Sequence, residues 1–382
     1  MKIGVDARSL MSPLTGIGRY TLEMCKALSK MPGVSLYLYS AFKKGSVVTE
    51  VGNTHNRAHY FYTKVIRQFW PEFYLPFETK KDQLDIFWGP SHRLPIFLGK
   101  NIPQVVSIHD LTWKYFSETM KPTNYWLERI YMPRALAKAT CVIASSEATA
   151  SDVRREFPGA HSKLYVIHHG VTQFDPASSE LKKDLMERPF FLFVGTVEPR
   201  KNLHRLLSAY AALPEEVRKK ASLVIAGGSG WGEVNIIEKI NSLGLHQYVH
   251  WLGYVDDAQL AELYKRALFL AMPSLYEGFG LPLIEAMSQG IPVLSSNTSS
   301  MPEVVADGGL LIDPLDVGSI QQGLHSLIMN SKLRDELAIR AKANVDRFKW
   351  DIAAEKLFEV FKETIFDHQN SKLSCHKESN HV

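Results

Sequence analysis

The stretch ALFLAMPSLYEGFGLPLIEAMSQGIPVLSS, residues 267–296, contains the parts of one complete repeat of a parallel sheet. Two short apolar runs, 267–274 and 291–296, flank a glycine-rich turn and a helical segment that starts at Pro282. Short, continuous apolar runs are typical of strands that are buried on both faces, and proline is well suited to the first turn of a helix. The stretch therefore predicts strand, turn, helix and strand, as in a doubly wound α/β sheet.

The same alternation recurs along both halves of the chain. In the first half the apolar runs are KIGVD (2–6), VSLYLYS (34–40), DIFWG (85–89), PQVVSIH (103–109), CVIASS (141–146) and KLYVIHHG (163–170). In the second half they are PFFLFVG (189–195), ASLVIAGG (221–228), YVHWLG (248–253), ALFLAMPS (267–274), IPVLSS (291–296) and GLLI (309–312). A chain of 382 residues exceeds what one core usually organises, so we expect two Rossmann-like doubly wound domains that face each other across a cleft.

The expected boundary is the polar stretch near residues 171–188, which lacks a sheet pattern. We predict an N-terminal domain at 1–175, a C-terminal domain at 176–350, a helix at 351–366 that packs back on the N-terminal domain, and a flexible polar tail at 367–382. Ligands of open parallel sheets bind at the carboxyl ends of the strands, so the loops there are the candidate site.

Composition and charge narrow the class of protein. Hydrophobic residues make up 45% and charged residues 22%, as in ordinary globular proteins, and a net charge of +4 is too small to indicate a nucleic-acid partner. We find neither a signal peptide nor the roughly 18 apolar residues that span a membrane, and expect a cytoplasmic protein. Cys25, Cys141 and Cys375 are widely spaced and are predicted to be reduced, non-catalytic thiols.

Glycines and cations follow two of the expected strands. Gly16 and Gly18 lie in TGIGRY, where a glycine-rich turn before a helix lets backbone amides approach a phosphate; a tight turn alone is the alternative. Arg200 and Lys201 follow the strand at 189–195 and are expected at the start of a helix. Because a helix N-terminus disfavours cations, a bound diphosphate would explain the pair, whereas an exposed charged face is the ordinary explanation.

Two carboxylates flank the glycine-rich turn of the first stretch. Glu277 precedes the turn and Glu285 lies inside the expected helix, with seven residues between the two. Carboxylates are natural acceptors for sugar and ribose hydroxyls, although a structural role remains the alternative. The chain lacks the clustered aspartates that hold Mg²⁺ beside a diphosphate, so we expect neither a metal site nor a cofactor.

Aromatic and basic residues mix in two further helical stretches, 62–81 and 120–138. The first contains Lys64, Arg67, Phe69, Trp70, Phe73 and Tyr74, and the second contains Trp126, Arg129, Tyr131 and Arg134. This mixture suits peripheral contact with a membrane surface, but aromatic stripes on helices more often pack in a core.

In combination these motifs resemble the retaining glycosyltransferases of family 4, which have the GT-B fold. EGFGLPLIE looks like the family's E-x7-E motif, while TVEPRKNL and TGIGRY match its other two signatures in order. SIHDL and AGGSGW extend the likeness over nearly the whole chain, to about residue 365.

The resemblance implies roles for individual residues. Arg200 and Lys201 would neutralise the donor diphosphate, Glu285 would bind the nucleotide ribose, and Glu277 would position the donor sugar. The amides of Gly278, Phe279, Gly280 and Leu281 would bind phosphate and sugar oxygens. His109 matches the histidine that faces the sugar from the N-terminal domain, although a satisfied core histidine is the ordinary interpretation of such a residue.

The resemblance also implies a reaction. The motifs GVDARSL, TGIGRY and VIHHGV resemble those of bacterial enzymes of O-antigen and related polysaccharide assembly. We therefore expect transfer of mannose from GDP-mannose to a glycan or lipid-linked glycan, with peripheral contact at the inner membrane. A UDP-sugar donor is the main alternative; a nucleotide-sugar epimerase and an inactive glycan-binding scaffold are more distant ones. The acceptor, linkage, processivity and oligomeric state are left open.

Overall fold

The computed structural model describes residues 1–10, 15–40, 51–52, 54–58, 72–73, 75–172, 188–230 and 235–379, with side chains described up to residue 372. The contacts divide the chain into two compact units. The first unit comprises Met1–Leu111, Trp126–Gly170 and Lys349–Val382, and the second comprises Thr112–Tyr125 and Val171–Phe348.

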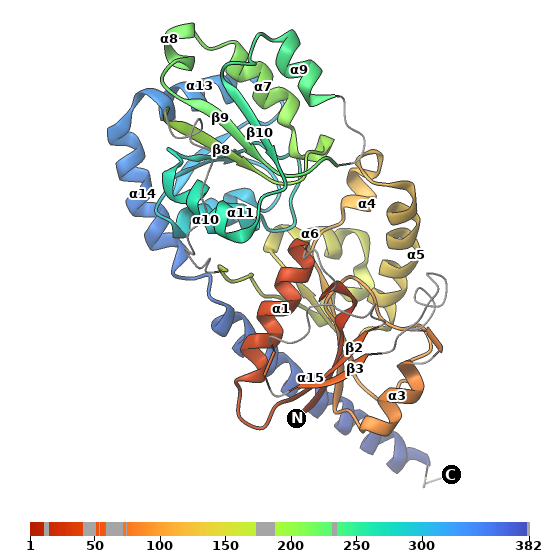
Figure 1. Cartoon of the computed structure of the whole chain (residues 1–382). Coiled ribbons are helices and arrows are strands. Elements are labelled where there is room, and N and C mark those ends of the chain that lie inside the picture. Colours follow the sequence, from red (N-terminus) through yellow and green to blue (C-terminus); the bar gives the residue numbers. More distant parts are fainter. Residues whose placement is uncertain are drawn as a thin grey trace. The chain divides into compact units, whose positions relative to one another are not determined.

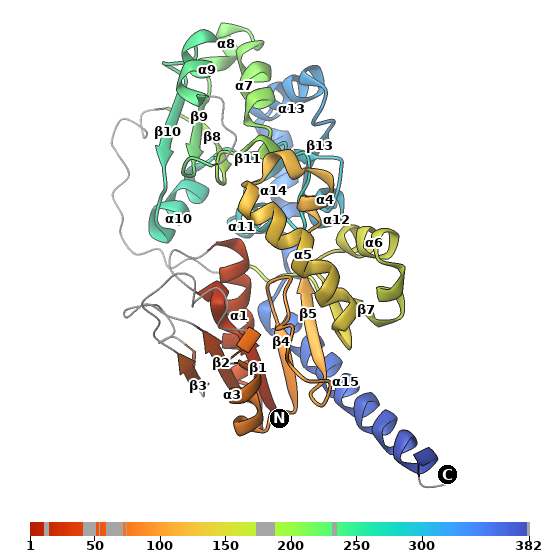
Figure 2. The ribbon, with the colours of Figure 1, turned by 90° about the vertical axis from the view of Figure 1, so that its right-hand side faces the viewer.

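The first unit is built on a parallel sheet with strand order β3-β2-β1-β4-β5-β6-β7 (Figure 2). Its strands are β1 (Lys2–Asp6), β2 (Ser35–Ser40), β3 (Thr54–Ala58), β4 (Ile86–Gly89), β5 (Gln104–Ile108), β6 (Cys141–Ala144) and β7 (Leu164–Val166). The helical segments are η1 (Ala7–Leu10), α1 (Gly16–Ser29), α3 (Leu75–Asp82), α5 (Pro122–Lys138, from Trp126 on), α6 (Glu147–Glu156), η4 (Pro158–Lys163) and α15 (Trp350–Ser379).

The second unit is also built on a parallel sheet, with order β10-β9-β8-β11-β12-β13 (Figure 2 labels all of these strands except β12). Its strands are β8 (Phe190–Val194), β9 (Ser222–Ala226), β10 (Val249–Gly253), β11 (Leu270–Met272), β12 (Val293–Ser296) and β13 (Gly309–Ile312). Its helical segments are α4 (Thr112–Tyr115), η3 (Ser117–Thr119), η6 (Pro199–Lys201), α7 (Leu203–Ala211), α8 (Glu215–Arg218), α9 (Ile236–Ser242), α10 (Asp257–Arg266), α11 (Leu281–Ser288), α12 (Met301–Val305), α13 (Val317–Met329) and α14 (Ser331–Val345).

Alternating side chains of β8 supply two separate cores, one on each face of the second sheet. Phe191 and Phe193 pack with residues of α7, α9 and α13, whereas Phe190 and Leu192 pack with residues of α10 and α11. Figure 1 shows α7, α9 and α13 on one side of this sheet and α10, α11 and α14 on the other. The expected doubly wound α/β architecture is therefore confirmed.

Three features differ from the sequence-based expectations. β3 was not predicted, because its sequence THNRA is polar; it pairs only with β2 at the sheet edge, where His55 and Asn56 are exposed. The polar tail expected from residue 367 is instead part of α15, which continues to Ser379, since DHQNSKLSCHKES contains no glycine or proline to end a helix.

The third difference is the segment Thr112–Tyr125, which was assigned to the N-terminal domain but packs in the second unit. Elsewhere the units meet in sequence at 170–171 and 348–349, near the expected boundaries, and α15 packs against α1 within the first unit. Most of the expected linker, residues 173–187, lies outside the described residues, as does much of the stretch 62–81. In the described part of the chain, no helix is both long enough and apolar enough to cross a bilayer.

Candidate functional site

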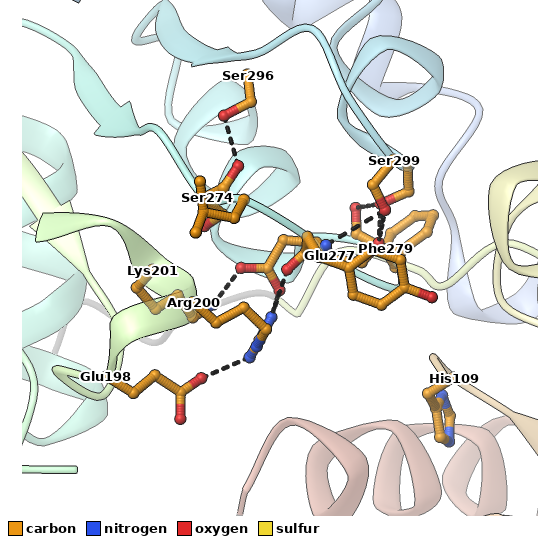
Figure 3. A network of polar contacts seen from close by, with 12 residues as sticks. His109, Glu198, Arg200, Lys201, Ser274, Glu277, Phe279, Ser296 and Ser299 are labelled. Atoms are coloured by element: carbon orange, nitrogen blue, oxygen red, sulfur yellow. Dashed lines mark hydrogen bonds and ion pairs between the residues drawn. The ribbon is translucent and has the colours of Figure 1, made fainter. Parts of the chain in front are cut away.

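Glu277 lies in the loop after β11 and binds both cations of the basic pair. Its Oε1 accepts a hydrogen bond from Lys201 Nζ at 2.6 Å, and its Oε2 accepts one from Arg200 Nη1 at 2.9 Å (Figure 3). Arg200 Nη1 also donates to the carbonyl of Tyr276 at 2.6 Å, and Arg200 Nη2 donates to Glu198 at 2.6 Å. The structure thus joins three predicted residues to Glu198, which the sequence did not single out.

The topology of the second sheet explains why these loops meet. β8 and β11 are neighbours, and the strand order reverses there: β9 and β10 lie beyond β8, while β12 and β13 lie beyond β11. Such a switch point opens a crevice at the carboxyl ends of the two strands. Arg200 and Lys201 follow β8 and Glu277 follows β11, so the network lies where the fold favours a ligand.

Burial and charge together set the ionisation of Glu277. Its residue is 7% exposed, and burial alone would raise the pKa of the carboxyl group. The charges of Arg200 and Lys201 outweigh that effect and lower the pKa to about 2. Glu277 is therefore ionised at neutral pH, and two carboxylates face two cations in the network.

The backbone around the basic pair differs from the expected helix start. Arg200 and Lys201 lie in η6, a single 3-10 turn before α7, and Asn202 adopts a left-handed conformation with φ of 61°. Asn202 Nδ2 donates to the carbonyls of Pro273 at 2.9 Å and Pro314 at 2.7 Å. Asn202 therefore fixes the basic turn to the loops after β11 and β13, a role that the sequence analysis missed.

Serines from the loop after β12 hold the turn that carries Glu277. Ser299 Oγ donates to the Glu277 carbonyl at 2.5 Å and accepts from the Glu277 amide at 3.3 Å. Ser300 Oγ donates to the carbonyls of Glu277 at 2.9 Å and Phe279 at 3.1 Å. Gly280 follows with φ of 97°, which glycine adopts without strain, and starts α11 at Leu281. Ser299 and Ser300 were not predicted from the sequence.

The other residues expected around the turn lie nearby in the second unit. The Phe279 ring is buried and packs edge-on against Phe348, with ring centroids 5.5 Å apart. Glu285 lies in α11, where Tyr264 Oη donates to its Oε2 at 2.9 Å. Glu285 thus has a separate hydrogen-bond partner from the Arg200 network. The ligand-binding roles of Gly278, Phe279, Gly280, Leu281 and Glu285 remain predictions.

Tyr115 and Phe116, from the first half of the sequence, pack against Tyr276, the residue before Glu277. The rings of Phe116 and Tyr276 stack with centroids 5.4 Å apart, and Tyr115 lies 5.9 Å from the Tyr276 ring. Both come from the Thr112–Tyr125 segment of the second unit. Since the Tyr276 carbonyl accepts from Arg200, this contact supports the backbone of the site.

In the first unit, His109 follows β5 and is held in one tautomer. Its Nε2 contacts the Pro90 carbonyl at 2.7 Å and must donate there, so its Nδ1 carries a lone pair. Nδ1 is buried and has no hydrogen-bond partner within the described residues. The His109 amide donates to His92 Nε2 at 2.9 Å, and His92 Nδ1 lies 3.2 Å from Glu128 Oε2. Glu128 and His92, neither of them predicted, therefore position His109.

The surroundings of His109 keep its ring neutral. Burial and, secondarily, the nearby His92 lower the pKa of His109 to about 4. The Tyr20 ring packs edge-on against it, with centroids 4.6 Å apart. At neutral pH, His109 offers a hydrogen-bond acceptor and carries no charge.

The glycines of TGIGRY start α1. Gly16 is the first residue of this helix, and the Thr15 side chain accepts a hydrogen bond from the Gly18 amide at 3.3 Å. The loop before Thr15, residues 11–14, lies outside the described residues. The prediction that Gly16 and Gly18 bind a phosphate remains a prediction. Cys25 and Cys141 are free and buried, and burial raises the pKa of each thiol to about 12.

Comparison with known proteins matches both halves of the chain. Residues 14–173 match the family model described as Glycosyltransferase Family 4, and residues 177–344 match that described as Glycosyl transferases group 1. O-antigen chain mannosyltransferase B of Escherichia coli is 30% identical over 396 residues, covering 95% of this chain and 100% of that protein.

Two solved structures share the fold at lower identity. The sucrose-phosphate synthase of Thermosynechococcus elongatus superposes with a TM-score of 0.76 at 20% identity, covering 95% of this chain and 98% of that one. HepE of Anabaena, solved in complex with UDP and glucose, superposes with a TM-score of 0.73 at 20% identity, covering 95% of this chain and 100% of that one.

Proposed function

This chain belongs to the family 4 glycosyltransferases and has the GT-B fold, and from that premise we propose that it transfers mannose from GDP-mannose to a glycan acceptor with retention of configuration. The observation that carries the choice of sugar is the 30% identity, over nearly the whole chain, to a protein named as an O-antigen chain mannosyltransferase. We therefore place the reaction in the assembly of an O-antigen-like polysaccharide, on a free or lipid-linked glycan.

The Arg200 network supplies the electrostatics that this reaction needs. The bond between the anomeric carbon and the diphosphate breaks, and the diphosphate gains negative charge while the sugar becomes positively charged. Arg200 and Lys201 would stabilise the leaving group, because cations held in place before the reaction need no reorganisation during it. The acceptor oxygen bonds to the anomeric carbon, and its proton passes to the diphosphate. These two cations supply the neutralisation, so we propose that transfer needs no metal.

Glu277 has two roles in this proposal. Its ion pairs hold Arg200 and Lys201 in the loop, and its carboxylate lies beside the place proposed for the donor sugar. Glu285, buried in α11, is proposed to accept hydrogen bonds from the ribose. His109 is proposed to accept a hydrogen bond from a sugar hydroxyl through Nδ1, since its low pKa makes it a poor base at neutral pH.

Nucleotide binding tests the donor without knowledge of the acceptor. We would titrate the purified chain with GDP, UDP and ADP by calorimetry in the absence of metal, and repeat the titration with Glu285→Ala. GDP-selective binding that is lost in the variant is the expected result. The matched control is Tyr264→Phe, which removes the hydroxyl that donates to Glu285 and keeps the carboxylate.

Each other outcome changes a different part of the proposal. UDP-selective binding would retain the transferase and overturn the mannose donor. A requirement for Mg²⁺ or Mn²⁺ would overturn metal independence. Binding of none of the three nucleotides would favour the inactive scaffold, and then turnover of GDP-mannose in the presence of acceptor glycans would be absent as well.

A further inference from the structure

A short loop after β4 exposes two large apolar side chains while burying their neighbours. Leu94 and Leu98 are 3% exposed each, whereas Ile96 is 39% and Phe97 is 58% exposed. Hydrogen bonds fix this arrangement. The Ile96 amide donates to Glu72 Oε2 at 2.5 Å, and Lys138 Nζ donates to the carbonyls of Pro95 at 2.5 Å and Ile96 at 2.7 Å.

The exposed loop belongs to a larger apolar surface. The rings of Phe73 and Phe97 lie 5.5 Å apart, and Phe77 follows in α3, four residues after Phe73 in the sequence. Phe73 and Phe77 are 58% and 68% exposed. Solvent-exposed aromatic side chains that touch one another are unusual in a surface that meets only water.

Helix α5 continues this surface from the position of Lys138. Trp126, Ile130 and Arg134 precede Lys138 at intervals of four residues, so they share one face of the helix. Trp126 is 55% and Ile130 is 42% exposed. The guanidinium of Arg129 lies 5.3 Å from the centre of the Trp126 ring.

The charge around the apolar side chains is mainly positive. The exposed basic side chains on these elements are Lys80, Lys81, Lys100, Arg129 and Arg134, of which Lys81 is paired with Glu78. Nearby acids are largely neutralised: Glu128 contacts Arg93 at 2.8 Å, and Glu78 contacts Lys81 at 2.9 Å. A basic rim around large apolar side chains is complementary to an anionic lipid surface, where cations meet the headgroups and aromatic rings enter the interface.

We propose that Phe73, Phe77, Ile96, Phe97, Trp126 and Ile130, with their basic rim, form a docking surface for an anionic lipid bilayer. All six residues lie in the first unit (Figure 1 labels α3 and α5), whereas the Arg200 network lies in the second. The surface would hold the first unit of the enzyme at the bilayer. The proposal concerns binding alone and does not depend on the identity of the donor or the acceptor.

Vesicle flotation of the full chain tests this proposal. We expect the protein to float with vesicles that contain phosphatidylglycerol, to bind phosphatidylcholine vesicles weakly, and to be released as salt is raised. The double variant Phe97→Ser with Trp126→Ser should weaken binding about tenfold, because it removes apolar area that enters the interface. Arg134→Gln should weaken it about fivefold, as expected for one basic residue near an anionic surface.

The matched control removes equally exposed apolar side chains from the second unit. Ile237 and Ile339 are 55% and 73% exposed on α9 and α14, so Ile237→Ser with Ile339→Ser should leave vesicle binding unchanged. Circular dichroism of every variant checks folding. Equal binding to both vesicle types, equal losses in the control, or no flotation at all would overturn the proposal. A dimer in light scattering that Phe97→Ser dissociates would assign the surface to a second copy of the chain instead.

Discussion

The loop after β11 in one parallel sheet and the loop after β5 in the other each carry a buried ionisable group, yet the electrostatics of the two groups are opposite. Glu277 is kept charged, with a pKa lowered to about 2 by Arg200 and Lys201. His109 is kept neutral, with a pKa lowered to about 4 by burial. Salt bridges surround the first group, and aromatic or uncharged contacts surround most of the second.

The difference indicates a division of chemical roles between the two units. A network with two fixed cations is suited to a ligand that gains negative charge, whereas a neutral imidazole in a fixed tautomer is suited to a hydroxyl group. Burial disfavours the charged form of both groups, but at Glu277 the charges of Arg200 and Lys201 outweigh burial, whereas at His109 burial prevails. Removing the partners of Glu277 and His109 one at a time tests this division of roles.

Lys201→Met should have the largest effect. It removes a cation proposed to contact the diphosphate, and we expect the transfer rate to fall about 10²- to 10³-fold, as for the loss of one preorganised group that stabilises a developing anion. Glu277→Gln should lower the transfer rate by a similar factor, because both cations lose the carboxylate that holds them in place. Steady-state transfer from the nucleotide sugar measures both.

Combining these two changes tests whether they act as one unit. The transfer rate of the double variant should lie within about threefold of the rate of either single variant, because the effects of residues that act as one unit do not add. Lys219→Ala breaks an exposed pair with Glu215 and should retain normal turnover. Fully multiplicative losses in the double variant would mean that Lys201 and Glu277 act independently.

The lowered pKa of His109 predicts that the stability of the fold depends on pH. Its folded pKa of about 4 lies below the ordinary 6.5, so the unfolded state binds a proton first as the pH falls. Its stabilising contribution is therefore complete above about pH 6.5 and is lost between pH 6.5 and 4, amounting to about 3 kcal/mol. We would measure the free energy of unfolding of wild type and His109→Asn by denaturant titration at several pH values in this range. The free energy of unfolding of the variant should change less with pH than that of wild type.

The difference between the two curves isolates His109, because other groups titrate in both proteins. Restricting the comparison to pH above 4.5 also keeps Glu277 ionised in the folded state throughout. Parallel curves would mean that His109 titrates with an ordinary pKa in the folded protein, and that burial does not keep its ring neutral.

Phe116 follows His109 closely in sequence but packs in the second unit, so its replacement tests the donor-binding unit alone. Phe116→Ala should weaken GDP binding about five- to tenfold, the amount expected for a lost aromatic pair, since the Tyr276 backbone would no longer be supported beside Arg200. Phe116→Tyr keeps the ring and should bind GDP normally. Calorimetry in which both variants bind like wild type would remove Phe116 from the site.

Local sequence predicted the parts of this site better than their connections. The apolar runs predicted the strands because buried parallel strands are continuous in hydrophobicity, and the polar edge strand β3 was missed for the same reason. Arg200, Lys201 and Glu277 were found through motifs. Their pairing spans more than 70 residues and depends on β8 and β11 being neighbours, which no local pattern encodes.

Supporting residues were missed because their side chains are ordinary for their local positions. Ser299 and Ser300 lie in a polar loop, where serine is common, and become specific only when β12 places them beside the Glu277 carbonyl. Glu128 lies on α5, whose mixture of aromatic and basic residues concealed its inward contact with His92. The packing of Phe116 on Tyr276 likewise follows from the fold.

Glu198 offers the smallest and most discriminating test of the charged loop. Both Glu198 and Glu277 accept from Arg200, but the Glu198 side chain is 23% exposed and the Glu277 side chain is 9% exposed. An anionic ligand competes more readily with the exposed carboxylate, so Glu198→Gln should strengthen GDP binding about threefold by leaving the network more positive. Glu277→Gln should instead weaken it. Equal weakening in both variants, measured by calorimetry at fixed ionic strength, would show that Glu198 orients Arg200 and does not compete with the diphosphate.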